Sequence, residues 1–212
     1  MSNVFATSRG LLMRTLLWIL LAVLCLSIGA YPLTYLVTDG KIGLLQTKSD
    51  ILLSDRLWRL GFYAHIVSGG IALLVGWTQF VKTWRMRFLG LHRNLGKLYV
   101  LMVCVSGVAA VCIAPFSSTG WVAGLGFGSL GVVWLYFTLQ AYRSVRQRDL
   151  RRHECQMVYS YSACLSAVTL RLWLPLLLVV FGLDFNLAYP IVAWLSWVPN
   201  LVVAHSIVSR IR

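Results

Sequence analysis

Residues 90–115, GLHRNLGKLYVLMVCVSGVAAVCIAP, join a short basic segment directly to a long apolar one. His92, Arg93 and Lys97 lie near its start, and the apolar stretch then continues to Pro115. About twenty apolar residues are enough to cross the hydrocarbon core of a bilayer, which is ~30 Å thick. The stretch therefore predicts a membrane-spanning helix with a charged end at one membrane surface.

The composition of the whole chain extends this prediction beyond one segment. Of its 212 residues, 59% are hydrophobic and only 12% are charged, whereas about a quarter of the residues in a soluble domain are charged. We therefore expect an all-α, polytopic membrane protein, with a single integral membrane domain over residues 1–212 and a central core made by its second to fifth helices. The six predicted spans are roughly 14–37, 61–81, 95–115, 120–142, 156–181 and 187–208.

The net charge of +13 is concentrated in short loops between the apolar segments. Loops 82–97 and 143–152 each carry five Lys or Arg residues, whereas loops 115–120 and 182–189 carry none. Because Lys and Arg stay preferentially on the cytoplasmic side, both termini are predicted to face the cytoplasm of a bacterial inner membrane. We expect the basic loops to contact anionic lipids there, and we do not expect nucleic-acid binding. Residues 42–60 mix leucines with charges, which predicts an interfacial helix on the outer surface.

Ionisable side chains within or beside the predicted helices are candidates for a functional site, because such groups are costly inside a membrane. His65 lies near the predicted outer end of the second helix, whereas His92 and His153 lie at the cytoplasmic ends of the third and fifth. Arg171 is the only arginine deep in a predicted span. Pro175 leaves the carbonyl of Arg171 without a helical partner, so we expect a kink in the fifth helix there.

Two of these histidines are followed by a glycine one helical turn later, His65 by Gly69 and His92 by Gly96. Such a glycine leaves space for a planar group bound at the imidazole, an arrangement that suits axial haem ligation. Glycine is also common in membrane helices, because small residues let helices approach closely. The spacing leaves both interpretations open, a cofactor pocket and helix packing.

Several segments together carry a resemblance to one family. They are FYAHIVSGGIALLVGWTQF (62–80), LHRNLGKLYV (91–100), Gly126-Phe127 with Trp134, HECQMVYSYS (153–162) and AVTLRLWLP (167–175). Over residues 58–180 the chain resembles the bacterial family of predicted membrane proteins known as domain of unknown function 2306. The resemblance implies a multi-span membrane protein and brings no established activity. Where the family often has a basic residue in the His153 segment, this chain has Tyr159, Ser160 and Tyr161, so an anion contact there would be altered.

The histidine positions are similar, more loosely, to those of the six-helix di-haem cytochromes b, which move electrons across membranes. This similarity implies that His92 and His153 are the axial ligands of the iron of one b-type haem, with Arg93 binding a haem propionate. The fourth helix carries no histidine, so His65 has no partner for a second haem. His65 and Arg171 would instead form a separate polar site near the outer face, for a quinone or an anionic group.

Three functions remain open on this basis. The first is a membrane redox protein that holds one haem b or a quinone. The second is a transporter or channel for a small anion or a lipid, which would use Arg171 in a kinked helix beside the glycine-rich fourth helix. The third is a non-catalytic membrane assembly partner. A metal site made by His92, His153 and Glu154 would require the third and fifth helices to meet at that end.

Overall fold

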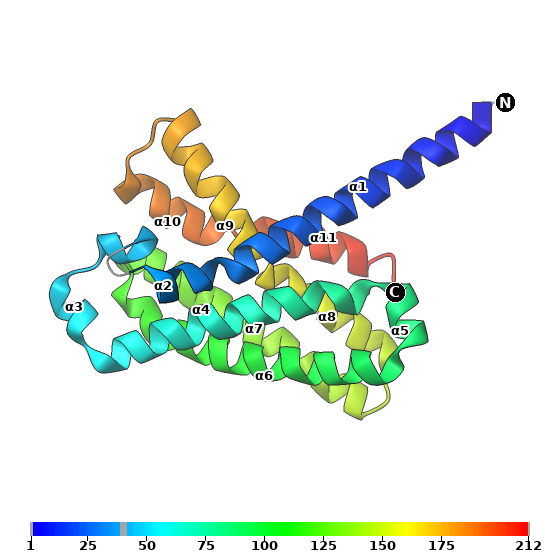
Figure 1. The fold of residues 1–212 in the computed structure, drawn as a ribbon, viewed down its shortest axis with the longest axis horizontal. Coiled ribbons are helices and arrows are strands. Elements are labelled where there is room, and N and C mark those ends of the chain that lie inside the picture. Colours follow the sequence, from blue (N-terminus) through cyan, green and yellow to red (C-terminus); the bar gives the residue numbers. More distant parts are fainter. Residues whose placement is uncertain (1, 39–41, 212) are drawn as a thin grey trace.

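The chain is helical throughout its regular structure in a computed structural model that describes residues 2–38 and 42–211 (Figure 1). Six helical stretches are long and apolar enough to cross a membrane, which confirms the predicted all-α fold with six spans. They are Thr15–Leu33, Arg56–Phe80, Leu89–Phe116, Trp121–Arg146, Leu150–Val180 and Phe185–Val208. Several begin earlier than their apolar residues because a cap starts the helix, as where Asp149 accepts a hydrogen bond from the backbone N–H of Arg152 at 2.9 Å.

The described elements follow one another in the order shown in Figure 1. They are α1 (Ser2–Ala30), η1 (Tyr31–Leu33), α2 (Thr34–Val37), η2 (Gly43–Thr47), α3 (Asp50–Ser54), α4 (Arg56–Gly76), η3 (Trp77–Phe80), α5 (Lys82–Arg87), α6 (Leu89–Ile113), η4 (Ala114–Phe116), α7 (Trp121–Arg146), α8 (Leu150–Cys164), α9 (Ser166–Pro175), η5 (Leu176–Val180), α10 (Phe185–Leu195) and α11 (Val198–Val208).

Helices α4, α6, α7 and α8 form a ring, as predicted for the core. α4 packs against α6, α6 against α7, α7 against α8 and α8 against α4, so that α6 and α8 are diagonally opposite. Outside the ring, α1 packs against α4, α10 against α7 and α11 against α8. We call the end of the ring that carries α5 and the 147–149 turn the basic end.

Glycines set the distance between several of these helices. A Cβ at Gly70 would lie 2.6 Å from the carbonyl oxygen of Gly29, so α4 and α1 meet backbone to backbone. A Cβ at Gly131 would lie 3.3 Å from the carbonyl oxygen of Gly107, so α7 approaches α6 in the same way. At these positions the small residues serve helix packing.

Buried hydrogen bonds connect three helices of the ring. The hydroxyls of Tyr99 on α6 and Thr138 on α7 lie 2.8 Å and 2.6 Å from that of Ser160 on α8. Trp134 Nε1 donates to the Tyr99 hydroxyl at 3.3 Å. Tyr99, Thr138 and Ser160 are completely buried, and polar bonds of this kind hold membrane helices together. Ser160 is therefore part of the core. It lies in the segment where the family that the chain resembles often has a basic residue.

Segment 42–60 does not form the single interfacial helix that its composition predicts. It contains instead the 3₁₀ turn η2, the short α3 and the start of α4. The side chains of Ser49 and Asp55 each accept hydrogen bonds from the backbone N–H groups that follow, so each starts a new helix. Leu45 is buried against Trp58, and η2 is therefore folded back onto the bundle.

The fifth span departs from α-helical geometry twice, after Cys164 and, as expected from Pro175, directly after that proline. α8 ends at Cys164 and α9 begins at Ser166, before Arg171 is reached, whereas Pro175 is followed directly by the π-helical turn η5. His153 and Arg171 therefore lie on two different helices, α8 and α9. α9 packs against α10 and α1, and α10 in turn packs against α7 of the ring (Figure 1).

The position of this break is explained by a matching break in the sixth span, between α10 and α11. Asn200 Nδ2 lies 3.2 Å from the carbonyl oxygen of Ser162, 3.0 Å from that of Ser196 and 3.1 Å from Thr169 Oγ1. The Thr169 hydroxyl also donates to the Ser196 carbonyl. Side chains of the two spans thus satisfy carbonyl groups beside both breaks, as interrupted membrane helices require.

Candidate functional site

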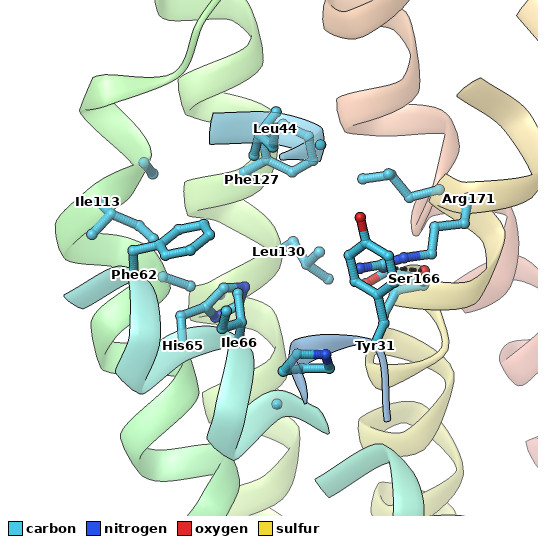
Figure 2. Close-up of a pocket in the computed structure, with 18 of the residues that line it drawn as sticks. Tyr31, Leu44, Phe62, His65, Ile66, Ile113, Phe127, Leu130, Ser166 and Arg171 are labelled. Atoms are coloured by element: carbon cyan, nitrogen blue, oxygen red, sulfur yellow. Dashed lines mark hydrogen bonds between the residues drawn. The ribbon is translucent and has the colours of Figure 1, made fainter. Parts of the chain in front are cut away.

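A cavity of about 490 Å³ lies between the ring, η1, η2 and α9, in the half of the bundle opposite the basic end (Figure 2). Its wall is mostly apolar and aromatic, and volumes of this order are typical of sites for small molecules. The apolar part of the wall includes Phe62, Ile66, Ile113, Phe127, Leu130 and Leu174.

Two of the predicted site residues line this cavity from opposite sides. His65 is on α4 and Arg171 is on α9, and Figure 2 shows them facing each other across the open volume. The two residues are far apart in the sequence, and it is the separation of α9 from the ring that leaves the space between them. The structure thus brings together the pair for which a separate polar site was predicted.

Arg171 has no carboxylate partner in the part of the chain that the structure describes. Its Nη1 donates to the carbonyl oxygen of Ala167 at 2.8 Å, and its guanidinium carbon lies 4.9 Å from the centroid of the Tyr31 ring. Within residues 2–38 and 42–211, no carboxylate forms an ion pair with Arg171. A cation without a counter-ion is costly inside a membrane, so the cavity favours a ligand that brings negative charge.

Three further polar side chains of the wall were not singled out from the sequence. Lys48, which follows η2, donates to the carbonyl oxygen of Phe116 and lies 6.0 Å from the centroid of the Trp58 ring. Burial lowers the pKa of the Lys48 ammonium. Trp58 is only 5% exposed, and neither its Nε1 nor Ser117 Oγ has a hydrogen-bond partner in the described part of the chain. The wall therefore offers two cations, Arg171 and Lys48.

Two tyrosines hold η2 beside the cavity. The rings of Tyr31 and Tyr35 meet edge to face, with centroids 5.6 Å apart. A Cβ at Gly43 would lie 2.9 Å and 3.0 Å from their two hydroxyl oxygens, and Gly43 has a φ of +52°. A residue with a side chain is therefore disfavoured twice at this position. Burial and a hydrogen bond with Tyr31 raise the pKa of Tyr35 to about 12, so its phenol stays neutral.

His65 is fixed by Ser106 of the neighbouring helix α6. Its Nδ1 lies 3.1 Å from the carbonyl oxygen of Ser106 and 3.0 Å from Ser106 Oγ, and the Ser106 hydroxyl donates to the carbonyl oxygen of His65 at 2.9 Å. A Cβ at Gly69 would lie 3.0 Å from Ser106 Oγ. The space that glycine leaves after His65 is thus used by a serine side chain.

The other predicted pair lies at the basic end, on the diagonal helices α6 and α8. His153 Nδ1 lies 2.9 Å from the carbonyl oxygen of Ala141. Because a carbonyl only accepts, Nδ1 carries the proton, and Nε2 of the neutral ring is left as an acceptor. His92 is half-buried and lies within electrostatic range of His153 and Arg85, while Arg93 is exposed.

The space beside His92 is also occupied. A Cβ at Gly96 would lie 3.6 Å from Gln79 Oε1, and this buried oxygen has no hydrogen-bond partner among the described residues. Glu154 lies 3.9 Å from Arg85 Nη1. In the part of the chain that the structure describes, no three His, Cys, Asp or Glu side chains gather to hold a metal ion, so the metal site with Glu154 is not formed there.

Comparisons of this chain with curated proteins and with solved structures gave no significant match. Residues 62–208 match the family described as "Predicted membrane protein (DUF2306)". The match begins after Lys48 and Trp58 and takes in the ring, His65, Arg171 and both interrupted spans. Since the match covers more than half of the chain, this protein belongs to the DUF2306 family of predicted membrane proteins.

Proposed function

We propose that this membrane protein binds an amphipathic anion in the cavity, a molecule with an apolar chain and a phosphate or carboxylate head. The observation that carries the proposal is the guanidinium of Arg171, which lines an apolar cavity within the membrane-spanning helices and has no carboxylate partner among the described residues. An anionic head would supply the missing charge through charge-assisted hydrogen bonds.

The rest of the wall supports the same kind of ligand. Lys48 adds a second cation to Arg171 in the cavity wall. The aromatic and aliphatic side chains would bury part of an acyl or isoprenoid chain, which is favourable at about 25 cal/mol per Å² of apolar surface. A neutral quinone would fit the apolar wall but would leave the charge of Arg171 uncompensated, so we favour an anion over a quinone.

The proposal corresponds to a lipid-handling membrane protein. We propose further that the basic end faces the cytoplasm of a bacterial inner membrane, because its Lys and Arg residues follow the positive-inside pattern. The cavity would then lie in the outer half of the bilayer, where a lipid of the outer leaflet would reach it.

Binding can be tested by quenching of tryptophan fluorescence, because Trp58 and Trp134 line the cavity. The purified protein in detergent micelles would be titrated with phosphatidic acid whose acyl chains carry bromine, and with brominated phosphatidylcholine as the neutral comparison. We expect saturable quenching by the anionic lipid only, and an affinity about tenfold lower in Arg171→Gln, which loses charged hydrogen bonds.

The matched control is Arg143→Gln, which removes an exposed arginine near the basic end. We expect this variant to bind the anionic lipid as the unchanged protein does. The proposal fails if Arg171→Gln binds equally well, if phosphatidylcholine quenches to the same extent, or if a quinone competes where anionic lipids do not.

A second candidate function is electron transfer through a b-type haem held by His92 and His153. It is supported by the free Nε2 of His153, whose Nδ1–H is anchored on a backbone carbonyl as in most metal-ligating histidines. Gln79 would have to move away from Gly96 to admit the ring. A reduced-minus-oxidised absorption spectrum of protein expressed with haem tests this candidate.

The haem candidate predicts a sharp α-band that His92→Ala and His153→Ala abolish. His205→Ala is the control, because His205 is exposed and its Nδ1 lies 2.9 Å from the Tyr159 hydroxyl. A spectrum without an α-band, from folded protein supplied with haem, would exclude this candidate and leave the anion proposal untouched.

A further inference from the structure

The hydrogen bonds of His65 determine which of its ring nitrogens carries the proton. Nδ1 lies 3.1 Å from the carbonyl oxygen of Ser106 and 3.0 Å from Ser106 Oγ. The carbonyl only accepts, and the single hydroxyl proton of Ser106 is donated to the carbonyl oxygen of His65. Neither oxygen has a proton to give, so Nδ1 must be the donor.

Nε2 of the neutral ring is therefore an acceptor with no hydrogen. Ser106 is completely buried and covers the Nδ1 edge, whereas His65 itself is partly exposed and lines the cavity. Nε2 makes no hydrogen bond with any residue in the described ranges. The edge of the imidazole that faces the cavity thus carries an acceptor, Nε2, without a hydrogen-bond partner in the described ranges.

The opposite side of the cavity has the reverse character. Arg171, which faces His65 in Figure 2, is a donor only. A head that spans the cavity must therefore accept hydrogen bonds at Arg171 and donate one at His65.

We infer that the cavity selects an anionic head that keeps one O–H group, such as a phosphate monoester with a single negative charge. Its charged oxygens accept from Arg171, and its P–O–H donates to Nε2 of His65. A phosphodiester of the same charge has no O–H and leaves Nε2 unpaired, which is costly for a buried acceptor. This inference rests on the proposed binding of an amphipathic anion and names the head that the site prefers.

A comparison of two lipids of equal charge distinguishes selection by His65 from the proposed binding of anions in general. Phosphatidic acid and phosphatidylmethanol with the same brominated chains would be compared at about pH 5, below the second ionisation of a phosphate monoester. The nitrogen NMR spectrum described below would be recorded at the same pH, where a ring protonated on both nitrogens would overturn the inference. We expect phosphatidic acid to bind about tenfold more tightly, as one charge-assisted hydrogen bond predicts. His65→Phe should remove this preference, whereas Arg171→Gln should weaken both lipids.

Ser106→Ala is the matched control, because the Ser106 carbonyl still holds the Nδ1 proton and the preference should remain. If the unchanged protein binds neither lipid, the proposed function itself fails. If it binds both equally, or if His65→Phe keeps the preference, the selection by His65 is wrong while anion binding stands.

The tautomer can be measured on the unchanged protein without any variant. In the nitrogen NMR spectrum of protein labelled with ¹⁵N-histidine, we expect His65 to show a protonated Nδ1 and an unprotonated Nε2, assigned by the loss of these signals in His65→Phe. A protonated Nε2 in the neutral ring would overturn the inference.

Discussion

The histidines and the arginine of the site show how much a single residue reveals about its own role. His65 and Arg171 stand out in the sequence because ionisable groups are rare within apolar spans. Ser106, which fixes His65, does not stand out in the sequence, because serine is common in membrane helices and its partner His65 is on another span. Lys48 lies in a loop with several charges, and only the folding of η2 places it in the cavity wall.

Gly76 illustrates a residue whose small size the core requires. A Cβ there would lie 2.6 Å from Cδ2 of Tyr161 and 3.0 Å from Cε2 of Tyr99, and both rings are buried. We expect Gly76→Ala to lower the free energy of unfolding by about 1–3 kcal/mol through overpacking. Gly90→Ala, with nothing within 4 Å of the new methyl group, should not. Unfolding of both variants in one detergent measures the difference, and equal stability would contradict the packing.

Lys48 gives the site a dependence on pH. Burial lowers its pKa, so the ammonium loses its proton at a lower pH than an ordinary lysine. Because the protonated form attracts the anion, binding of phosphatidylmethanol, whose charge stays constant, should weaken by about fivefold as the pH rises through this pKa. In Lys48→Arg the affinity should stay constant over the same range, since a guanidinium keeps its proton. A flat profile for the unchanged protein would show that Lys48 does not contact the head.

At the scale of elements, the six spans follow from hydropathy, but their interruptions do not. Apolar segments of sufficient length determine where spans form, and caps such as Asp149 determine where helices start. The break after Cys164 could not be predicted from Pro175, because Asn200 and Thr169 stabilise it from both spans. The division of segment 42–60 into separate helices can be predicted from the capping residues Ser49 and Asp55.

Asn200 should control the coupling of the two interrupted spans. Asn200→Leu keeps the branched shape of the side chain but leaves the carbonyl groups of Ser162 and Ser196 without this donor, which should cost about 1–3 kcal/mol of stability. We expect faster amide hydrogen exchange in α9 and α10 and unchanged exchange in the ring. Asn94→Leu, at an exposed position on α6, should have no such effect. Uniformly faster exchange across the ring as well would contradict a local role.

For the whole molecule, the ring of four helices could be predicted from the sequence and the cavity could not. The ring follows from the order of the spans and from short connections. The cavity depends on the break that separates α9 from α8 and on η2 folding over its side. The similarity to the di-haem cytochromes b remains a prediction. Gly69 and Gly96, whose spacing suited axial haem ligation, lie against Ser106 and Gln79.

The orientation of the molecule in the membrane is predicted from its loops. Green fluorescent protein fused after the C-terminus should fluoresce, because both ends are expected in the cytoplasm. Alkaline phosphatase fused after Ser118, in the uncharged loop between α6 and α7, should be active, because that loop is expected outside. The reverse pair of results would place the basic end outside the cell and the cavity in the cytoplasmic half of the bilayer.

The most direct test of the central claim is native mass spectrometry of the protein purified from its own membranes in mild detergent. We predict one tightly held anionic amphiphile per chain, which is lost in Arg171→Gln and retained in Arg143→Gln. Equal retention in the two variants, or a neutral molecule in the same place, would contradict the assignment of the cavity as an anion site.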